Sequence, residues 1–366
     1  MGKGTVVLVM ALIGLVIAAG GCMGSEKPSE TPQGTHSSGP SMTQTPSTTS
    51  TSHVTETHSA SSSPGNSQTD TGTETTSTEA VQKLTWASPW EYSPIRVDGR
   101  EYVITHYVVL YEVRPNETSP LYRYRIEKSE EVTNLTVYGR DFYGSKVKVG
   151  TFKVYEYRTV ITPINAAVMK GDITIKVWYT ERTSEAFIYP WDIGWAAGSG
   201  TDNVVGFEVD YGNESLIYTN PLSLGKSTLP YIGGNQNLLD ELNPDLMNLY
   251  YGWFAVLNVG IWADWSGRNL LVPQSGTWRD YFGNEWSWKT RPAGTVRISG
   301  IEFKTVEGEW SYLWNGTRFN GTATVAPKIF IPLEVRGEFT YVTDSGLPET
   351  IYGHFKVEKM TLSNVR

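Results

Sequence analysis

The chain has 366 residues, a formal net charge of −8 and a single cysteine. An acidic chain lacks the basic face that a nucleic-acid partner requires, so we expect no nucleic-acid binding. One cysteine also excludes a disulfide within the chain and a zinc site built from cysteines. Residues 81–366 are enough for one large β domain or two smaller ones.

The N-terminal residues have the order of a secretory signal peptide. Lys3 is the only charge before an apolar run over 5–17, and small residues follow up to Cys22. The run is shorter than the roughly 20 apolar residues that cross a bilayer. The pattern therefore predicts a signal peptide at 1–21 rather than a transmembrane helix. The alternative is a plain signal peptide, or an uncleaved anchor, with an incidental cysteine.

The segment Ala19-Gly20-Gly21-Cys22 resembles the lipobox of secreted lipoproteins, with Ala19 where leucine is usual. The resemblance implies that Cys22 becomes the lipid-modified N-terminus and anchors the protein to the outer face of the cell membrane. A lone thiol fits this role, because a free thiol is otherwise a liability in an exported chain. We expect the membrane to be a partner through this anchor.

Residues 22–80 are rich in Ser, Thr and Pro, and the first aromatic residue is Trp86. Such a segment buries too little apolar surface to offset its ordering entropy, so the composition predicts a disordered stalk. Ser/Thr-rich tracts with Pro are typical of O-glycosylated stalks. As a bare coil, this stalk would span about 40 Å.

Residues 81–366 contain all 13 tryptophans and several segments of alternating apolar and polar residues. Aromatic and β-branched residues at this density favour strands, and the period of two indicates antiparallel strands. The predicted strands cover 101–113, 146–160, 172–180, 203–211, 295–306, 322–342 and 350–362. The sequence favours one extracellular, mainly β domain, built as a curved antiparallel sheet that forms a half-barrel or a sandwich.

Gly150, Gly337 and Gly353 each stand two residues before a Phe inside a strand pattern. Glycines in strands mark bulges or bends, which favours a curled sheet. The polar connection 343–348 predicts a hairpin between the last two segments. This hairpin resembles those of half-barrel, lipid-binding lipoproteins, including bacterial lipoprotein carriers, and the resemblance implies a curved sheet wrapped around a helix.

One stretch breaks the β pattern. Asn243, Pro244 and Asp245 are helix start signals, and Gly260 is a stop signal. The helix they predict, over 244–259, is apolar on nearly every side and must be buried or in contact with lipid. We consider a helix buried under the sheet, the wall of a hydrophobic ligand pocket, or a buried strand pair.

Catalytic motifs are sparse. Only His106 and His354 fall within the β domain, and no Gly-x-Ser-x-Gly elbow occurs, which argues against a Ser-His-Asp site. No loop has the acidic spacing of a calcium site. We therefore expect no cofactor, no metal site and no catalytic residue.

The enzyme alternative is a carbohydrate-active hydrolase that uses two carboxylates beside tryptophans. Such a pair must lie roughly 5 to 10 Å apart. The candidates are Asp192, Asp264, Glu285 and Glu309.

Our leading functional hypothesis is non-catalytic binding of a hydrophobic or carbohydrate ligand by the aromatic-rich sheet. Tryptophans can stack on the apolar side of a sugar or line an apolar pocket. The ligand-binding candidates are Trp191, Trp195, Trp253, Trp262 and Trp265. A structural or accessory envelope protein is a further alternative.

The β domain contains five Asn-x-Ser/Thr sequons, which are candidate N-glycosylation sites of an exported glycoprotein. They are Asn116, Asn134, Asn213, Asn315 and Asn320. Together with the stalk, they are typical of an archaeal surface lipoprotein. The sequence leaves the oligomeric state open.

Overall fold

The computed structural model describes residues 94–165, 171–183, 203–242, 249, 252, 269–314, 316–343 and 345–365. All of them belong to one compact unit of the chain. The signal peptide 1–21, Cys22 and the stalk up to residue 80 lie outside the described residues, so the predicted domain boundaries stay predictions.

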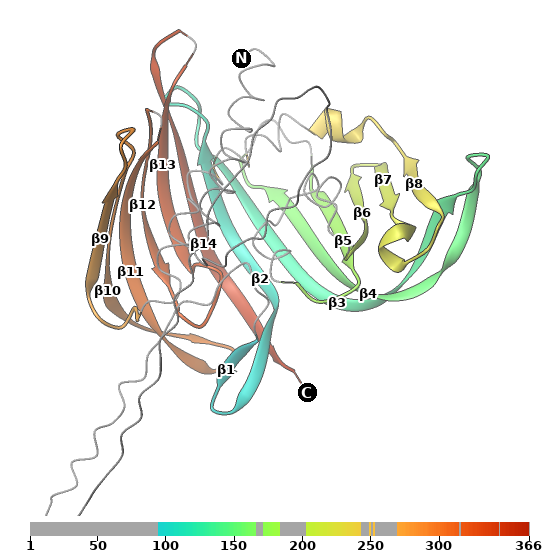
Figure 1. Ribbon diagram of the computed structural model, residues 1–366, viewed down its shortest axis with the longest axis horizontal. Helices are drawn as coiled ribbons and strands as arrows, with labels where there is room; N and C mark the ends of the chain where they lie inside the picture. Colours follow the sequence, from blue (N-terminus) through green and yellow to red (C-terminus); the bar gives the residue numbers. More distant parts are fainter. Residues whose placement is uncertain are drawn as a thin grey trace, which may run out of the picture. The chain divides into compact units, whose positions relative to one another are not determined.

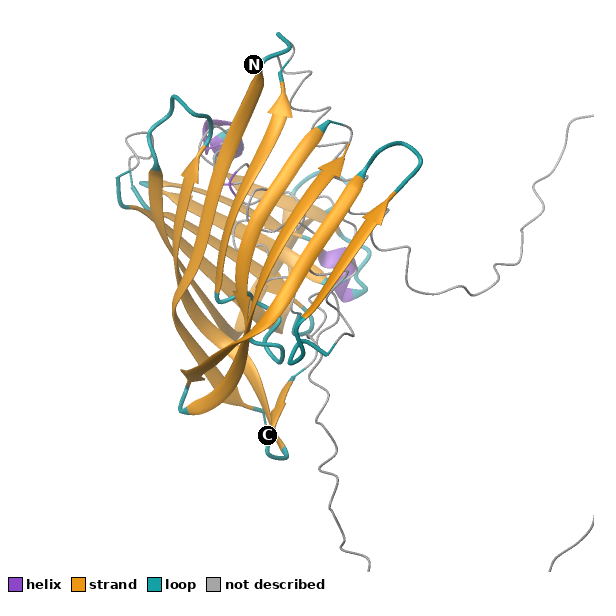
Figure 2. Ribbon diagram, turned by 90° about the vertical axis from the view of Figure 1, so that its left-hand side faces the viewer, coloured by secondary structure: helices purple, strands orange, loops and turns teal. Residues whose placement is uncertain are grey.

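The described residues are dominated by strands (Figure 2), which confirms the mainly β prediction. One antiparallel sheet contains 14 strands. The strands are β1 (Ile95–Val97), β2 (Arg100–Arg114), β3 (Tyr122–Arg140), β4 (Lys146–Pro163), β5 (Ile173–Tyr179), β6 (Val204–Tyr211), β7 (Glu214–Thr219), β8 (Leu229–Gly234), β9 (Gln274–Arg279), β10 (Glu285–Ile298), β11 (Ile301–Trp314), β12 (Thr317–Val325), β13 (Glu334–Val342) and β14 (Pro348–Asn364).

The strand order is β4-β5-β6-β7-β8-β3-β2-β14-β13-β12-β11-β10-β9, and β1 pairs with β2 (Figure 1). Because β3 pairs with β4 as well as with β8, strands β3 to β8 form a hydrogen-bonded ring. The ring closes where Gly139 and Arg140 pair with Pro230 and Leu229. The remaining strands lie in the order β2-β14-β13-β12-β11-β10-β9, with β1 beside β2. They form an open, curved part of the same sheet.

Alternation along the strands decides which face is buried. In β10, Trp286 and Trp288 point to the core, while Ser287 and Lys289 are exposed. Their partners in β11 alternate in the same way, because directly paired residues share a face. The main core therefore lies against one face of the open strands, and their other face is left to solvent.

The ring strands also contribute to a second apolar cluster, which is separate from the main core. Its buried members come from four strands and are Val137, Val154, Trp178 and Val205. Trp178 donates from Nε1 to Glu156 Oε2 at 2.8 Å, so its polar atom is satisfied. Strand β5 uses its other face for the main core, through Ile173 and Ile175.

Helical backbone is short in the described residues. It comprises 238–242, Leu249 and Gly252, together with the 3-10 helix η1 (Pro221–Leu224). Leu249 and Gly252 belong to the predicted helix 244–259 and are buried; its other residues lie outside the described ranges. Tyr111 of β2 donates from its hydroxyl to the carbonyl of Leu249 at 2.8 Å. The prediction of an apolar helix buried against the sheet is confirmed at these two residues.

The structure corrects two of the predicted strands. The segment 295–306 is divided by a turn at Ser299 and Gly300, between β10 and β11. The segment 322–342 is divided by the connection 326–333, between β12 and β13. Ser299-Gly300 is a turn signal that lies between two alternating runs, whereas apolar residues continue through the connection 326–333 and hide that division.

The glycine pattern has two explanations in the structure. Gly150 adjoins a bulge in the pairing of β3 with β4, as expected. Gly337 and Gly353 are instead direct partners in regular register, next to Gly321 of β12. The predicted hairpin at 343–348 is confirmed, since β13 and β14 pair across it.

No helix within the described ranges is both long enough and apolar enough to span a membrane.

Candidate functional site

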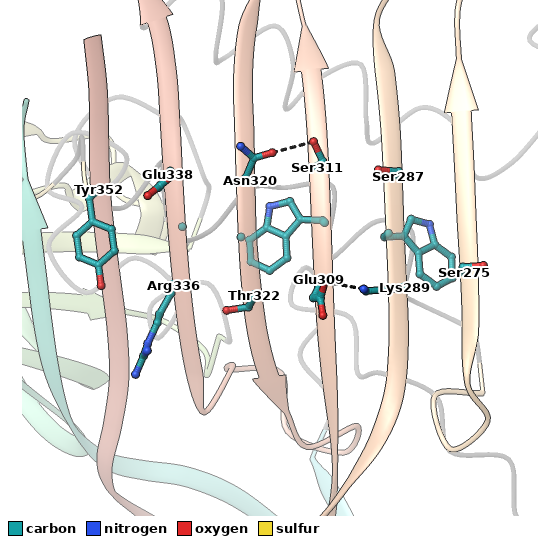
Figure 3. A pocket seen from close by; sticks show the side chains of 14 residues that line it. Ser275, Ser287, Lys289, Glu309, Ser311, Asn320, Thr322, Arg336, Glu338 and Tyr352 are labelled. Carbon is teal, nitrogen blue, oxygen red and sulfur yellow. Dashed lines mark hydrogen bonds and ion pairs between the residues drawn. The ribbon is translucent and has the colours of Figure 1, made fainter. Parts of the chain in front are cut away.

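An open trough of about 650 Å³ crosses strands β9 to β14 (Figure 3). Its side chains come from six neighbouring strands, each contributing one to three residues. The lining residues are Ser275, Ser287, Trp288, Lys289, Glu309, Trp310, Ser311, Asn320, Gly321, Thr322, Arg336, Gly337, Glu338 and Tyr352.

Strand register arranges the polar lining residues in two rows that run across the sheet. Because paired residues share a face, every member of a row points to the same side. The upper row in Figure 3 contains Ser287, Ser311, Asn320, Glu338 and Tyr352. The lower row contains Ser275, Lys289, Glu309, Thr322 and Arg336.

The residues between the two rows point the other way, toward the core. Trp288 and Trp310 are each only 4% exposed. A Cβ added at Gly321 would collide with the Trp310 ring, so this glycine lets the ring lie across β12. The lining of the trough therefore combines the two polar rows with Trp288, Trp310, Gly321 and Gly337, which lie between them.

Two cations and two carboxylates line the trough, so it has no net charge. Lys289 Nζ pairs with Glu309 Oε2 at 2.9 Å, and both side chains are exposed. Arg336 pairs with Glu334, outside the trough, at 2.8 Å. Glu338 is the second carboxylate. A ligand with a large charge of one sign gains little from this balance.

Neutral hydrogen-bonding groups lie between these charges. Ser311 donates from Oγ to Asn320 Oδ1 at 2.8 Å. This fixes the amide, whose nitrogen is a double donor. Tyr352 ends the upper row with a half-buried ring. Burial raises the pKa of the Tyr352 hydroxyl, and the nearby Glu112 carboxylate raises it further, so the hydroxyl stays a neutral donor.

The lower row continues beyond the trough into a half-buried charge cluster around the buried His354. His354, the partner of Arg336, contacts Glu112 from Nδ1 at 2.9 Å and Glu334 from Nε2 at 3.0 Å. Arg123 donates to the other oxygen of Glu112 at 2.7 Å. These contacts tie together β2, β3, β13 and β14 beside the trough.

The two carboxylates of this cluster have lowered pKa values. Burial raises the pKa of Glu112, but hydrogen bonds from His354 and Arg123 outweigh burial and lower it. Burial acts in the same way on Glu334, and hydrogen bonds from His354 and Arg336 lower its pKa. Across the described part of the chain, no group of three or more His, Cys, Asp or Glu side chains is suited to hold a metal ion.

Most residues predicted from sequence to bind a ligand lie outside the described ranges. This holds for Trp191, Trp195, Trp253, Trp262 and Trp265, and for the carboxylates Asp192 and Asp264. Those residues stay predictions.

Glu285 and Glu309 share the polar face. The strand partner of Glu309 is Lys289, and Lys289 lies four residues after Glu285 along β10. At about 3.4 Å per residue, their backbones are roughly 14 Å apart along the strand. Glu285 is also paired with Arg279. Each of these two carboxylates is therefore paired with a cation rather than with the other.

The sequons occupy different surroundings. Asn134 and Asn213 are exposed, and Asn116 accepts from Thr118 in the turn between β2 and β3. Asn320 lies in the trough, so a glycan on it would occupy this site. Asn315 lies outside the described residues.

Sequence reasoning missed Glu338, Arg336 and Tyr352 as site residues. Each is a polar residue at an outward position of a strand, which looks like any solvent-exposed residue. The available signal was the pair Gly337 and Gly353, because the trough crosses the sheet beside these glycines.

No protein-family model and no curated protein matches this chain. Two solved structures are similar to it. One is a candidate lipoprotein from Parabacteroides distasonis, with 12% identity and a TM-score of 0.19, covering 76% of this chain and 100% of that one. The other is a DUF1329 family protein from Desulfovibrio piger, with 9% identity and a TM-score of 0.20, covering 72% of this chain and 86% of that one. Scores this low carry no argument about fold or function.

Proposed function

We propose that this chain is an exported, lipid-anchored surface protein whose β domain binds a neutral glycan, without catalysis, in the trough on β9 to β14. The observation that carries the proposal is the double row of outward side chains, which combines hydrogen-bonding groups, balanced charge and one aromatic ring. The leader, Cys22 and the stalk support the location.

The chemistry of the trough suits sugar hydroxyl groups. Each hydroxyl both donates and accepts, and the rows alternate donors with acceptors. Asn320 and Arg336 supply donors, while Glu338 supplies an acceptor. The Tyr352 ring offers a flat apolar surface for a pyranose. Because the trough is open along the sheet, a polymer could lie across it without threading a chain end.

A glycan fits this site better than a hydrophobic ligand does. The trough presents the charged and hydroxyl side chains of its two rows beside Trp288 and Trp310, and tryptophan rings can also stack on a sugar. The rest of the apolar face of the open strands packs into the main core. On that apolar face, the helical residues Leu249 and Gly252 already lie against Tyr111. The trough carboxylates Glu309 and Glu338 stand on β11 and β13 and are separated by β12 (Figure 3).

Calorimetric titration of the full chain in mild detergent with soluble neutral polysaccharides tests the proposal. We expect Tyr352→Ala to weaken binding by about tenfold, which corresponds to about 1.4 kcal/mol. Tyr281→Ala is the matched control, because Tyr281 is an exposed tyrosine in the turn after β9, outside the trough.

Affinity for a neutral ligand should change little with salt, since screening acts on charges. Unchanged affinity in Tyr352→Ala would contradict the proposal. Glycopeptide mass spectrometry showing a glycan on Asn320 would also contradict it, because the trough would then be filled.

A further inference from the structure

Two hairpin turns share one sequence pattern. Residues 140–146 read Arg-Asp-Phe-Tyr-Gly-Ser-Lys, and residues 279–285 read Arg-Asp-Tyr-Phe-Gly-Asn-Glu. The first joins β3 to β4 and the second joins β9 to β10. They lie at opposite sides of the sheet (Figure 1). We call these two turns the aromatic turns.

The aromatic turns also share their geometry. In each, Oδ1 of the aspartate, Asp141 or Asp280, accepts from the backbone N–H groups two and four residues later, at 2.8 to 2.9 Å. In each, the glycine has a positive φ, 81° at Gly144 and 84° at Gly283. The aspartate and the glycine therefore define the turn, and the two residues between them are free to vary.

Both turns place two exposed aromatic rings at these variable positions. Phe142 and Tyr143 are 94% and 89% exposed, and Tyr281 and Phe282 are 98% and 85% exposed. They are the four most exposed large hydrophobic side chains in the described part of the chain. In each pair the rings meet edge to face, with centroids 5.7 and 5.8 Å apart.

A third turn shows that this backbone does not require aromatic residues. In the turn between β13 and β14, Thr343 N–H donates to Leu347 O at 2.9 Å, and Gly346 N–H donates to Thr343 O at 2.8 Å. The same bonds close the aromatic turns. The third turn has Asp344 and Ser345 at the corresponding positions. The exposed aromatic pairs are therefore not explained by folding.

Cations flank the aromatic turn between β3 and β4. Lys146 Nζ lies 3.9 Å from the ring centroid of Tyr138 and 4.5 Å from that of Tyr231. Arg140 lies over the same Tyr231 ring at 5.9 Å. The carboxylate of Asp141 is engaged by the turn backbone. This turn thus combines exposed aromatic rings with a cationic base.

We propose that the aromatic turns contact the lipid bilayer, with the turn between β3 and β4 as the main contact. Aromatic rings partition to the headgroup region of membranes, and nearby Lys and Arg side chains pair with lipid phosphates. A stalk of about 40 Å leaves the domain within reach of the membrane that anchors it. The inference is independent of the trough and rests on the proposed function only for the location at a membrane.

Fluorescence quenching in vesicles tests this inference. The full chain is reconstituted into phosphatidylcholine vesicles, with or without phosphatidylglycerol, that contain nitroxide-labelled lipid. A fluorophore is attached at Ser145→Cys, which keeps both aromatic residues of the turn. The parent chain supplies the blank for any label on Cys22. Glu302→Cys is the control, because Glu302 is exposed near the turn between β10 and β11.

We expect strong quenching at position 145, little at position 302, and more quenching with phosphatidylglycerol present. Phe142→Ser with Tyr143→Ser should remove most of the quenching at position 145, and Trp at both positions should preserve it. Circular dichroism melting shows whether each variant is folded. Equal quenching at 145 and 302 would overturn the inference. So would a signal that follows protein density in the vesicle, which would indicate contact with a second copy.

If Cys22→Ser combined with Phe142→Ser and Tyr143→Ser failed to release the chain from membranes, the anchor proposal would fail separately.

Discussion

The ring strands and the open strands belong to one sheet, but they bury their side chains differently. In β5, a ring strand, five of seven residues are buried, and they contribute to both apolar clusters. In β10, an open strand, buried and exposed residues alternate. Strands β3 to β6 of the ring thus contribute buried residues to two apolar clusters, whereas the open strands β9 to β14 keep one polar face for the trough. Stability and binding are therefore expected to separate between the two regions.

The largest effect should come from a ring residue. Trp178→Ala removes a buried ring from the second cluster and leaves Glu156 without its indole donor. We expect the free energy of unfolding to fall by about 3 to 5 kcal/mol. Trp278→Ala on β9 is the control, since that ring is 42% exposed and should cost about 1 kcal/mol or less. Urea denaturation measures the free energy of unfolding of both variants. Equal losses in the two variants would contradict the proposed difference in burial between the ring strands and the open strands.

A smaller effect is expected where the helical residues meet the sheet. A methyl group at Gly252 would collide with the Tyr111 hydroxyl and would crowd Val113. Gly252→Ala should therefore cost about 1 to 3 kcal/mol through overpacking. Thermal melting checks this change. The control is Gly171→Ala, because a Cβ at Gly171 would lie in open space. Gly99 also has open space but is unsuitable, because its positive φ would strain an alanine.

The charge cluster beside the trough should make stability depend on acid. The pKa values of Glu112 and Glu334 are lowered from 4.5 in the folded chain, so the unfolded chain binds protons at higher pH. Their contribution is present above pH 4.5 and is lost as the pH falls through the folded pKa values. Urea denaturation across this range should show a flatter pH dependence for Glu334→Gln. If the pH dependence of stability in Glu334→Gln were the same as in the parent chain, the charge cluster would not be a source of acid sensitivity.

The smallest effect on stability is expected at the trough itself. The pair of Lys289 and Glu309 is exposed on both sides, and such pairs contribute about 1 kcal/mol or less. Lys289→Ala should thus leave the melting temperature nearly unchanged. A large loss of stability would show that the polar face supports the fold rather than binding.

Local alternation predicted β2, β4, β5, β6, β14 and the final hairpin, but it missed β3, the longest strand. The buried helix was predicted from its start and stop signals, and the described residues Leu249 and Gly252 agree with it. Strand β2 extends by only one residue at each end beyond the predicted 101–113. Ring closure could not be predicted, because it depends on two residue pairs between β3 and β8 that are distant in sequence. No local pattern encodes the pairing of Gly139 with Pro230.

The trough could not be predicted for a related reason. Ser311, Asn320, Glu338 and Tyr352 come from four different strands, and only the register brings them into one row. Sequence reasoning favoured tryptophans, but Trp288 and Trp310 point to the core. The repeated pattern of the aromatic turns is present in the sequence, but strand alternation carries no information about which residues occupy a turn.

Hydrogen exchange of the full chain, with and without a neutral oligosaccharide that binds it, tests the central claim most directly. The account predicts that the ligand slows exchange in β11 to β14, at the backbone around Ser311, Asn320, Glu338 and Tyr352, and leaves the ring strands β5 to β7 unchanged. Slowed exchange in the ring, with none in β11 to β14, would contradict the account.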